Sequence, residues 1–247
     1  MLTSERRQIL LQRLAQDGRL VATELAAEFD TSEDTIRRDL RELAAEGLLV
    51  RVHGGALPAS PAVQPLAARR AIAPDLKARL ARRAARLLRP GMTVILDGGT
   101  THAALVAALP DDLELTVITH SPTIATLLEP FPRVDVILVG GRLLRHSMVA
   151  VGAEAIEAFL RVRADLCFLG VTGVHAEAGL TTGDHEEAAI KRRMSAQAAE
   201  TVVIATPDKL GAISHFGIVP LAEVTTLVIA KETEPKLDGW NGELIRA

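Results

Sequence analysis

The stretch from Thr31 to Gly55, TSEDTIRRDLRELAAEGLLVRVHGG, decides the fold of the first part of the chain. Its apolar residues recur at helical spacing and define one face: Ile36, Leu40, Leu43 and Ala44. Thr31 or Ser32 supplies a hydroxyl suited to a helix N-cap, and Gly47 tolerates the left-handed conformation that often ends a helix. The spacing therefore predicts a short amphipathic helix, and the LLVRVHGG that follows indicates a strand and a glycine turn.

Two further helices are predicted upstream of this stretch. SERRQILLQRLAQDG (residues 4–18) carries apolar residues at helical spacing, and VATELAAEF (residues 21–29) is a second, shorter helix. Three short helices, a tight turn and a β-hairpin are the elements of a winged helix-turn-helix, whose third helix enters the DNA major groove. We therefore expect a DNA-binding unit over residues 1–57.

Candidate DNA contacts lie on the third helix and on the hairpin. Arginines can contact phosphates or guanine, and short hydroxyl side chains can donate to either. The candidates are Ser32, Thr35, Arg37, Arg38, Arg41, Arg51 and His53. A plainer interpretation is that the arginines only solvate the helix or pair with its own Glu33, Asp34 and Glu42. The complete set of elements favours DNA binding.

The sequence pattern changes after this unit, from helical periodicity to a proline-rich segment and then to short apolar runs. Residues 56–74, ALPASPAVQPLAARRAIAP, contain four prolines and no regular period, so a linker is predicted over residues 58–73. Beyond it come short apolar runs, most of them separated by helical stretches: TVILDGG, LTVITHS, VDVILVGG, ADLCFLGV, TVVIATP and TTLVIAK. Such runs are typical of buried parallel strands. Residues 74–247 are therefore predicted to form a larger, mainly parallel-sheet α/β domain.

The composition narrows the class of protein. The chain has 247 residues, 48% hydrophobic and 24% charged, which is typical of a globular protein of one or two domains. Its single cysteine excludes an internal disulfide, and no signal segment or membrane-length apolar run appears, so we expect a cytoplasmic protein. The net charge of −3 conceals a basic segment, because residues 61–89 hold 8 basic residues and 1 acidic residue.

A glycine-rich turn follows the first predicted strand of the second domain. VILDGGTTHAAL (residues 94–105) places Asp97 at the strand end, followed by Gly98, Gly99, Thr100 and Thr101. The glycines let the backbone approach an anion, helix N-terminal amides point at it, and the threonines add hydroxyl donors. The pattern predicts a phosphate-binding turn, with a simple strand-to-helix connection as the alternative.

Other polar residues follow other strands, and ligands of open α/β sheets lie beyond the carboxyl ends of the strands. The further ligand-binding candidates are His120, Ser121, Arg142, Gly173, Lys191 and Lys209. Lys191 is equally well explained as a solvated helix cation near Glu187. The histidines are dispersed rather than set at metal-ligand spacing, so we predict no metal site and no cofactor, and Cys167 is predicted to lie in the core.

These motifs resemble those of the DeoR family of bacterial transcriptional regulators. TIRRDL followed by RVHGGA, and later ILDGGTT, VILVGGRL, LGVTGV and EEAAIKRRM, carry the similarity over nearly the whole chain. The resemblance implies a repressor of a carbohydrate-utilisation operon that binds duplex operator DNA. It also implies a C-terminal domain similar to ribose-5-phosphate isomerase that senses a phosphorylated sugar or related metabolite. Many members carry Asp where this chain has Thr206, which leaves the ligand preference near Lys209 open.

We further expect a homo-oligomer of at least two subunits, because one winged helix-turn-helix reads few base pairs.

Two other function classes are open. A sugar-phosphate isomerase-like enzyme with an appended DNA-binding domain needs a general base, commonly a carboxylate beside the phosphate. The turn that carries acidic residues in the isomerases reads GVTGV here (residues 170–174), so we predict no catalytic residue and no enzyme. DLKARLARRAARLLRP (residues 75–90) suggests a membrane-surface helix, but packing of its apolar face on the sheet is the preferred interpretation, and no membrane partner is expected.

Overall fold

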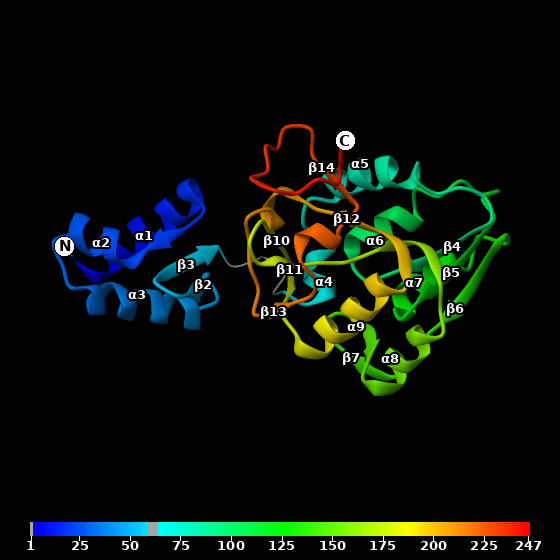
Figure 1. Ribbon diagram of the computed structural model, residues 1–247, viewed down its shortest axis with the longest axis horizontal. Coiled ribbons are helices and arrows are strands. Elements are labelled where there is room, and N and C mark those ends of the chain that lie inside the picture. The colour runs from blue at the N-terminus through cyan, green and yellow to red at the C-terminus, as the bar shows by residue number, and fades with distance from the viewer. Residues whose placement is uncertain (1, 59–63) are drawn as a thin grey trace.

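The computed structural model describes residues 2–58 and 64–247, which form a small N-terminal unit and a larger α/β domain (Figure 1). Within residues 2–58 three helices pack beside a small antiparallel sheet of order β1-β3-β2. The bounds are α1 Thr3–Asp17, β1 Leu20–Val21, α2 Ala22–Glu28, α3 Glu33–Ala45, β2 Leu49–Val52 and β3 Gly55–Pro58. The predicted winged helix-turn-helix is confirmed, and β1 adds a strand that the sequence did not indicate.

The apolar face of α3 holds the N-terminal unit together. Its buried side chains join a core that is completed by α1, α2 and the hairpin: Leu10, Leu14, Leu20, Leu25, Ile36, Leu40, Leu43 and Leu49. Ser32 is the N-cap, because its side chain accepts a hydrogen bond from the Thr35 amide. Asp39 of α3 is buried and accepts a hydrogen bond from Arg6 of α1 at 2.5 Å, which ties the two helices together.

The segment 58–73, expected to be a linker, contains ordered structure. Residues 59–63 of that segment lie outside the described residues. A short helix, α4 (Leu66–Arg69), begins with the buried Leu66, whose amide donates to the His146 carbonyl oxygen at 2.9 Å. Four residues are too few to show a helical period, which is why the sequence pattern did not reveal it.

A parallel sheet of order β15-β14-β12-β9-β4-β5-β6 forms the centre of residues 64–247. The strands are β4 Met92–Leu96, β5 Leu115–Thr119, β6 Val134–Leu138, β9 Ala164–Phe168, β12 Ala198–Ile204, β14 Thr226–Ile229 and β15 Glu243–Arg246. All but β15 overlap the predicted apolar runs, although β12 begins three residues before its run, and the predicted α/β class is confirmed. The edge strand β15 was not predicted because its sequence, ELIR, is largely polar and only partly buried.

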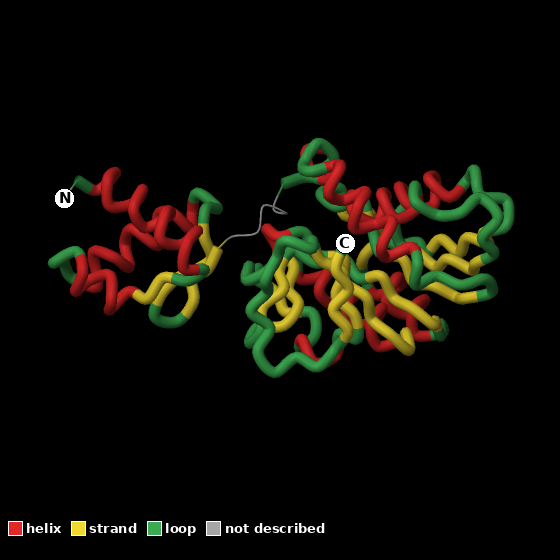
Figure 2. The backbone as a smooth tube through the Cα atoms, turned by 90° about the horizontal axis from the view of Figure 1, so that it is seen from above, coloured by secondary structure: helices red, strands yellow, loops and turns green. Residues whose placement is uncertain are grey.

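Helices cover both faces of this sheet (Figure 2). One face carries α5 (Pro74–Ala85), α6 (Thr100–Val106) and α7 (Pro122–Leu128), and the other carries α8 (Ala153–Leu160) and α9 (His185–Ala196). Leu80 and Ala84 of α5 are fully buried against the sheet, whereas Arg82 and Arg83 are exposed. The apolar face of the basic helix is therefore covered by protein and not available to a membrane surface.

No helix within the described residues combines the length and the apolar character needed to cross a lipid bilayer.

Smaller elements complete the domain. They are β7 Arg142–Leu144, β8 Val149–Val151, β10 Gly173–His175, β11 Gly179–Thr182, β13 Phe216–Gly217 and the 3-10 helices η2 Pro207–Lys209 and η3 Leu221–Glu223. The strand order reverses between β4 and β9, with β5 and β6 on one side and β12, β14 and β15 on the other. Such a reversal opens a crevice at the carboxyl ends of the two central strands, which is where ligands of open α/β sheets bind.

Candidate functional site

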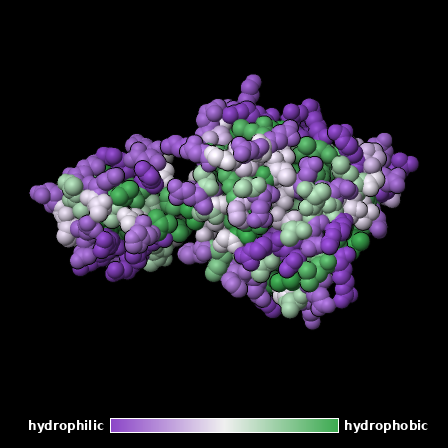
Figure 3. Space-filling view, in the orientation of Figure 1, coloured by the Kyte–Doolittle hydropathy of each residue, from purple (hydrophilic) through white to green (hydrophobic). Residues whose placement is uncertain are grey.

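The outer face of α3 carries most of the candidate DNA contacts. With about 100° of rotation per helical residue, Arg38 and Arg41 lie nearly opposite the buried Ile36, and Arg37 lies at the flank. All three arginines are exposed. The side of the N-terminal unit along which α3 runs in Figure 1 is strongly hydrophilic in Figure 3. The helix therefore presents Arg38 and Arg41 to solvent on a hydrophilic face.

The ion pairs on α3 distinguish Arg37 from Arg38 and Arg41. Arg37 donates to Glu33 at 2.6 Å, as the plainer interpretation expects. Arg38 and Arg41 form no ion pair within the described residues, because Glu42 pairs with Arg7 of α1 instead. Exposed pairs of this kind contribute only about 0–1 kcal/mol, so Arg37 can exchange Glu33 for a phosphate at little cost.

The remaining N-terminal candidates divide between the cap of α3 and the hairpin. The Ser32 hydroxyl accepts the Thr35 amide at 3.2 Å and lies 2.9 Å from the Thr35 hydroxyl, so both side chains build the N-terminus of α3. Arg51 and His53 are exposed on the β2–β3 hairpin, whose turn depends on Gly54 at φ +79°.

In the α/β domain, the glycine-rich turn joins β4 to α6 at the strand-order reversal. Gly99 has φ +118° and precedes the helix, a conformation that strongly favours glycine. A Cβ added at Gly98 would lie 2.5 Å from a side-chain carbon of Val149, so this position requires glycine. The turn and the first helical residues, Thr100 and Thr101, line a cavity that the ends of β9 and β12 also border.

Asp97 organises the floor of this cavity. One carboxylate oxygen accepts the Gly98 amide at 2.7 Å and His120 Nε2 at 2.8 Å, and the other accepts the Gly170 amide at 2.8 Å and Lys191 Nζ at 2.5 Å. Burial alone would raise the pKa of Asp97, but Lys191 and His120 outweigh it and hold that pKa well below its usual range. Both oxygens thus have protein partners, and Asp97 joins the ends of β4, β5 and β9 with α9.

Lys191 is a buried member of this floor rather than a solvated helix cation. Its side chain is 6% exposed and also lies 4.0 Å from Glu187. Burial acts to lower the pKa of Lys191, but the charges of Asp97 and Glu187 outweigh it and raise that pKa. The ammonium charge is therefore balanced by two carboxylates inside the protein.

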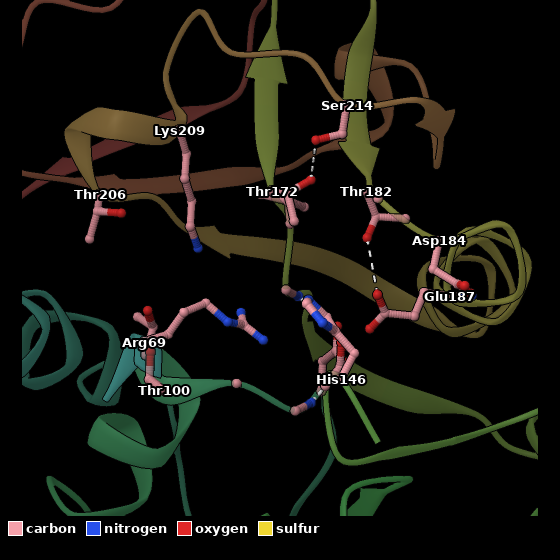
Figure 4. A pocket seen from close by; sticks show the side chains of 18 of the residues that line it. Arg69, Thr100, His146, Thr172, Thr182, Asp184, Glu187, Thr206, Lys209 and Ser214 are labelled. Carbon is pink, nitrogen blue, oxygen red and sulfur yellow. Dashed lines mark hydrogen bonds between the residues drawn. The ribbon is translucent and has the colours of Figure 1, made fainter. Parts of the chain in front are cut away.

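Other cations border the cavity without such compensation. Figure 4 shows Arg69 and Lys209 pointing into it from different elements, α4 and η2. Burial lowers the pKa of Lys209 to about 8; Asp208 opposes this effect, and Arg69 and Lys77 add to it. Burial likewise lowers the pKa of Arg69 and that of Lys77. This cluster of partly desolvated cations is suited to a small anion.

Four predicted ligand-binding residues do not line the cavity. His120 lies behind Asp97 and is fully buried, and the Ser121 hydroxyl caps α7. Arg142 is exposed on β7 and pairs with Glu186, and Gly173 packs within β10, where a Cβ would lie 2.3 Å from the Ala212 carbonyl oxygen. Each of these four residues thus has a partner or a packing role outside the cavity.

The structure also adds lining residues that the sequence reasoning did not select. They are Arg69, Lys77, His146, Thr172, Thr182, Thr206 and Ser214. The Thr172 and Ser214 hydroxyls lie 2.6 Å apart, and the Thr182 hydroxyl donates to Glu187 at 3.3 Å (Figure 4). Thr172 and Thr206 stand inside the GVTG and ATPDK motifs, which was the available signal; the others had none.

The described residues contain no group of three His, Cys, Asp or Glu side chains arranged to hold a metal ion. His102 is buried, and this burial lowers its pKa to about 4 although Asp97 opposes the effect. Its Nδ1 donates to the Gly98 carbonyl oxygen at 2.9 Å, so the neutral ring supports the glycine turn. Cys167 is fully buried in the core, and burial raises the pKa of its thiol.

Comparison with known proteins gives two domain matches. The sequence matches the DeoR-like helix-turn-helix domain over residues 6–61 and the DeoR C terminal sensor domain over residues 73–231. A putative aga operon transcriptional repressor of Escherichia coli O157:H7 is 31% identical over 231 residues, 92% of this chain and 86% of that protein. The glycerol-3-phosphate regulon repressor of Escherichia coli K12 is 30% identical over 226 residues, 90% of each chain.

Among solved structures, ribose 5-phosphate isomerase A from Methanocaldococcus jannaschii aligns with 56% of this chain and 54% of that chain, with a TM-score of 0.41 and 20% identity.

Proposed function

The chain belongs to the DeoR family of transcriptional regulators, and from this premise we propose that it represses a carbohydrate-utilisation operon until a phosphorylated sugar or related metabolite binds. One observation carries the proposal. A cavity into which Arg69 and Lys209 point, at the strand-order reversal, lies in the same chain as a helix that exposes Arg38 and Arg41. One chain thus carries both a DNA-binding helix and a cavity suited to a small anion.

The DNA-binding half of the proposal rests on α3 and the hairpin. Arg38 and Arg41 project from the face opposite the core, where the recognition helix of this motif meets base edges. Arg37 and Arg51 flank them and are assigned to phosphates, and His53 to the wing contact. We assign Ser32 and Thr35 to the helix cap, with any phosphate contact secondary.

The sensing half rests on the match between the cavity and a phosphate ester. The Gly99 amide and the amides and hydroxyls of Thr100 and Thr101 supply hydrogen-bond donors at the start of α6, and Lys209 supplies charge. Thr172, which follows β9, Thr182 at the end of β11 and Thr206, which follows β12, line the same cavity, and their hydroxyls are suited to the hydroxyl groups of a polyol or sugar. Asp97 and Lys191 bond to each other, so they hold the floor of the cavity together without contacting the ligand.

We also infer a homo-oligomer of at least two subunits acting in the compartment that holds the chromosome, the cytoplasm of a prokaryotic cell. Two winged helices on a symmetric operator supply the specificity that one lacks. Light scattering of the purified protein, alone and with operator, measures this number directly.

The isomerase alternative is not supported. The curated relatives are transcriptional regulators, and the larger domain matches a regulatory sensor domain. Three carboxylates of the cavity also have structural partners: Asp97 as described, Asp184 as the N-cap of α9, and Glu187 with Thr182.

Operator selection followed by effector screening tests the proposed function. Genomic fragments are selected by the purified protein at moderate salt, and release of the enriched fragment is then measured with a panel of sugar phosphates and their unphosphorylated forms. We expect one enriched sequence and release only by phosphorylated compounds, which also raise the melting temperature. Selection without an enriched sequence would contradict the DNA-binding half, and release by unphosphorylated compounds alone would contradict the anion-sensing half.

A further inference from the structure

Arg69 lines the cavity of the α/β domain but lies close in sequence to the DNA-binding unit. It is the last residue of α4, and ten residues separate it from Pro58, the last residue of the DNA-binding unit. Both ends of α4 are fastened to the α/β domain: the Leu66 amide donates to the His146 carbonyl oxygen at 2.9 Å, and Lys77 Nζ donates to the Arg69 carbonyl oxygen at 2.7 Å. Helix α4 is therefore held beside the cavity.

The guanidinium of Arg69 turns from α4 into the cavity (Figure 4). Its Nε is buried and has no hydrogen-bond partner within the described residues. A buried, unpartnered donor of a charged group is costly, and such groups are normally satisfied by a partner or a ligand. The charges of Glu187 and Asp97 lie near enough to act on Arg69, but both carboxylates are already engaged by Lys191.

Neighbouring cations repel the guanidinium of Arg69. Lys77 and Lys209 each lose basicity partly because of the charge of Arg69. A bound phosphate would remove this repulsion and would accept the planar fork of the guanidinium through two parallel hydrogen bonds. A bound anion would therefore stabilise the observed placement of the Arg69 side chain in the cavity.

We infer that Arg69 is a ligand of the effector's phosphate group and that its capture transmits effector binding to the segment leading to the DNA-binding unit. This inference rests on the proposed function. An effector changes operator affinity only through its different affinities for the DNA-competent and DNA-incompetent states. Arg69 supplies such a difference, because among the cavity residues contributed by the α/β domain it is the one nearest along the chain to the DNA-binding unit.

The test compares Arg69→Ala and Arg69→Lys with Arg70→Ala, a control at the exposed neighbouring position. Binding of inorganic phosphate is measured by calorimetry, and operator affinity is measured with and without saturating glycerol 3-phosphate or glucose 6-phosphate. We expect Arg69→Ala to bind phosphate at least tenfold more weakly and to bind operator without sugar phosphate within twofold of the wild type. Saturating sugar phosphate should then no longer release it.

Measurements at saturating sugar phosphate distinguish the role of Arg69 as a ligand from its role in transmission. If Arg69 were a ligand only, higher concentrations of sugar phosphate would restore full release in Arg69→Ala, and this result would overturn the transmission role. Unchanged phosphate affinity, or an equal loss in Arg70→Ala, would overturn the ligand role. Arg69→Lys, which keeps the charge but not the fork, should show an intermediate loss, and equal melting temperatures exclude a folding defect. A wild-type protein that neither compound releases would contradict the proposed function, and phosphate binding would still decide the ligand role.

Discussion

The recognition helix and the cavity hold their positive charges in opposite ways. Arg38 and Arg41 of α3 are exposed and have no ion-pair partner within the described residues, whereas Lys191 is buried against two carboxylates. An exposed charge is screened by salt and can be removed with little effect on the fold, but a buried charge is coupled to its partners and to stability. The first arrangement suits a polyanion read over many contacts, whereas the second fixes the floor of the cavity and leaves a small anion to the partly buried Arg69 and Lys209.

Salt should separate the two sites most strongly. If two subunits together neutralise about six phosphates, operator affinity falls about 10³-fold between 50 and 200 mM salt, because bound counterions are released. Sugar-phosphate affinity should fall by less than about tenfold over the same range, because the cavity charges are partly buried. Fluorescence anisotropy with operator and calorimetry with the sugar phosphate measure the two slopes, and equal slopes would remove the distinction.

The buried carboxylate should be the most sensitive residue for stability. Asp97→Ala leaves Lys191 buried without its nearest partner and removes the acceptor of two backbone amides, so we expect a loss of about 3–5 kcal/mol in the free energy of unfolding. Trp240, the single tryptophan, packs in the core of the α/β domain and reports its unfolding in denaturant.

The matched control is Asp208→Ala, an exposed carboxylate at the same cavity, which should change the free energy of unfolding by no more than about 0.5 kcal/mol. Equal losses in the two variants would show that burial does not distinguish these carboxylates.

The sequence predicted features set by local periodicity more completely than those set by tertiary contacts. The face of α3 follows from the spacing of Ile36, Leu40 and Leu43, and each predicted strand follows from one apolar run. The bond between Lys191 and Asp97 joins residues 94 positions apart, and no local pattern encodes it. Arg69 was assigned to a linker because prolines surround it, and only the packing of α4 shows its place in the cavity.

A smaller effect distinguishes the arginines of α3 from one another. Arg38→Ala should weaken operator binding by about 1–3 kcal/mol, the range for a base-edge contact, because Arg38 lies opposite the core. Arg37→Ala should fall at the low end of that range, since Arg37 lies at the flank and must first leave Glu33. Melting temperatures should not change.

Arg13→Ala serves as the control for this series, because Arg13 is a surface arginine of α1 that pairs with Glu28. Binding by Arg38→Ala at the wild-type level would return that arginine to the plainer interpretation of a solvated helix charge.

The smallest expected effect is that of pH, which should change the affinity of the cavity for sugar phosphate but not the affinity of the DNA-binding unit for operator. Lys209 has a pKa of about 8, lowered chiefly by burial, and a bound phosphate dianion must raise it. Below pH 8 the lysine already carries its proton, so binding of a sugar phosphate needs no further protonation. Above pH 8 binding must take up a proton, and affinity should fall by up to about tenfold per pH unit until the pKa of the bound state is reached. Arginine does not titrate in this range, so operator affinity without effector should stay constant from pH 7.5 to 9.

Calorimetry in two buffers of different ionisation enthalpy measures this proton uptake directly. The charged groups around Lys209 are Asp208, Arg69, Lys77 and Lys191. Lys209→Met removes the titrating group, so its weaker sugar-phosphate affinity should no longer decline between pH 8 and 9. If the decline persisted in Lys209→Met, another of these cations would be the proton acceptor, and Lys77, whose pKa burial also lowers, would be the next lysine to replace. If operator affinity fell in parallel, the contrast between exposed arginines and buried lysines would not account for the behaviour of the two sites.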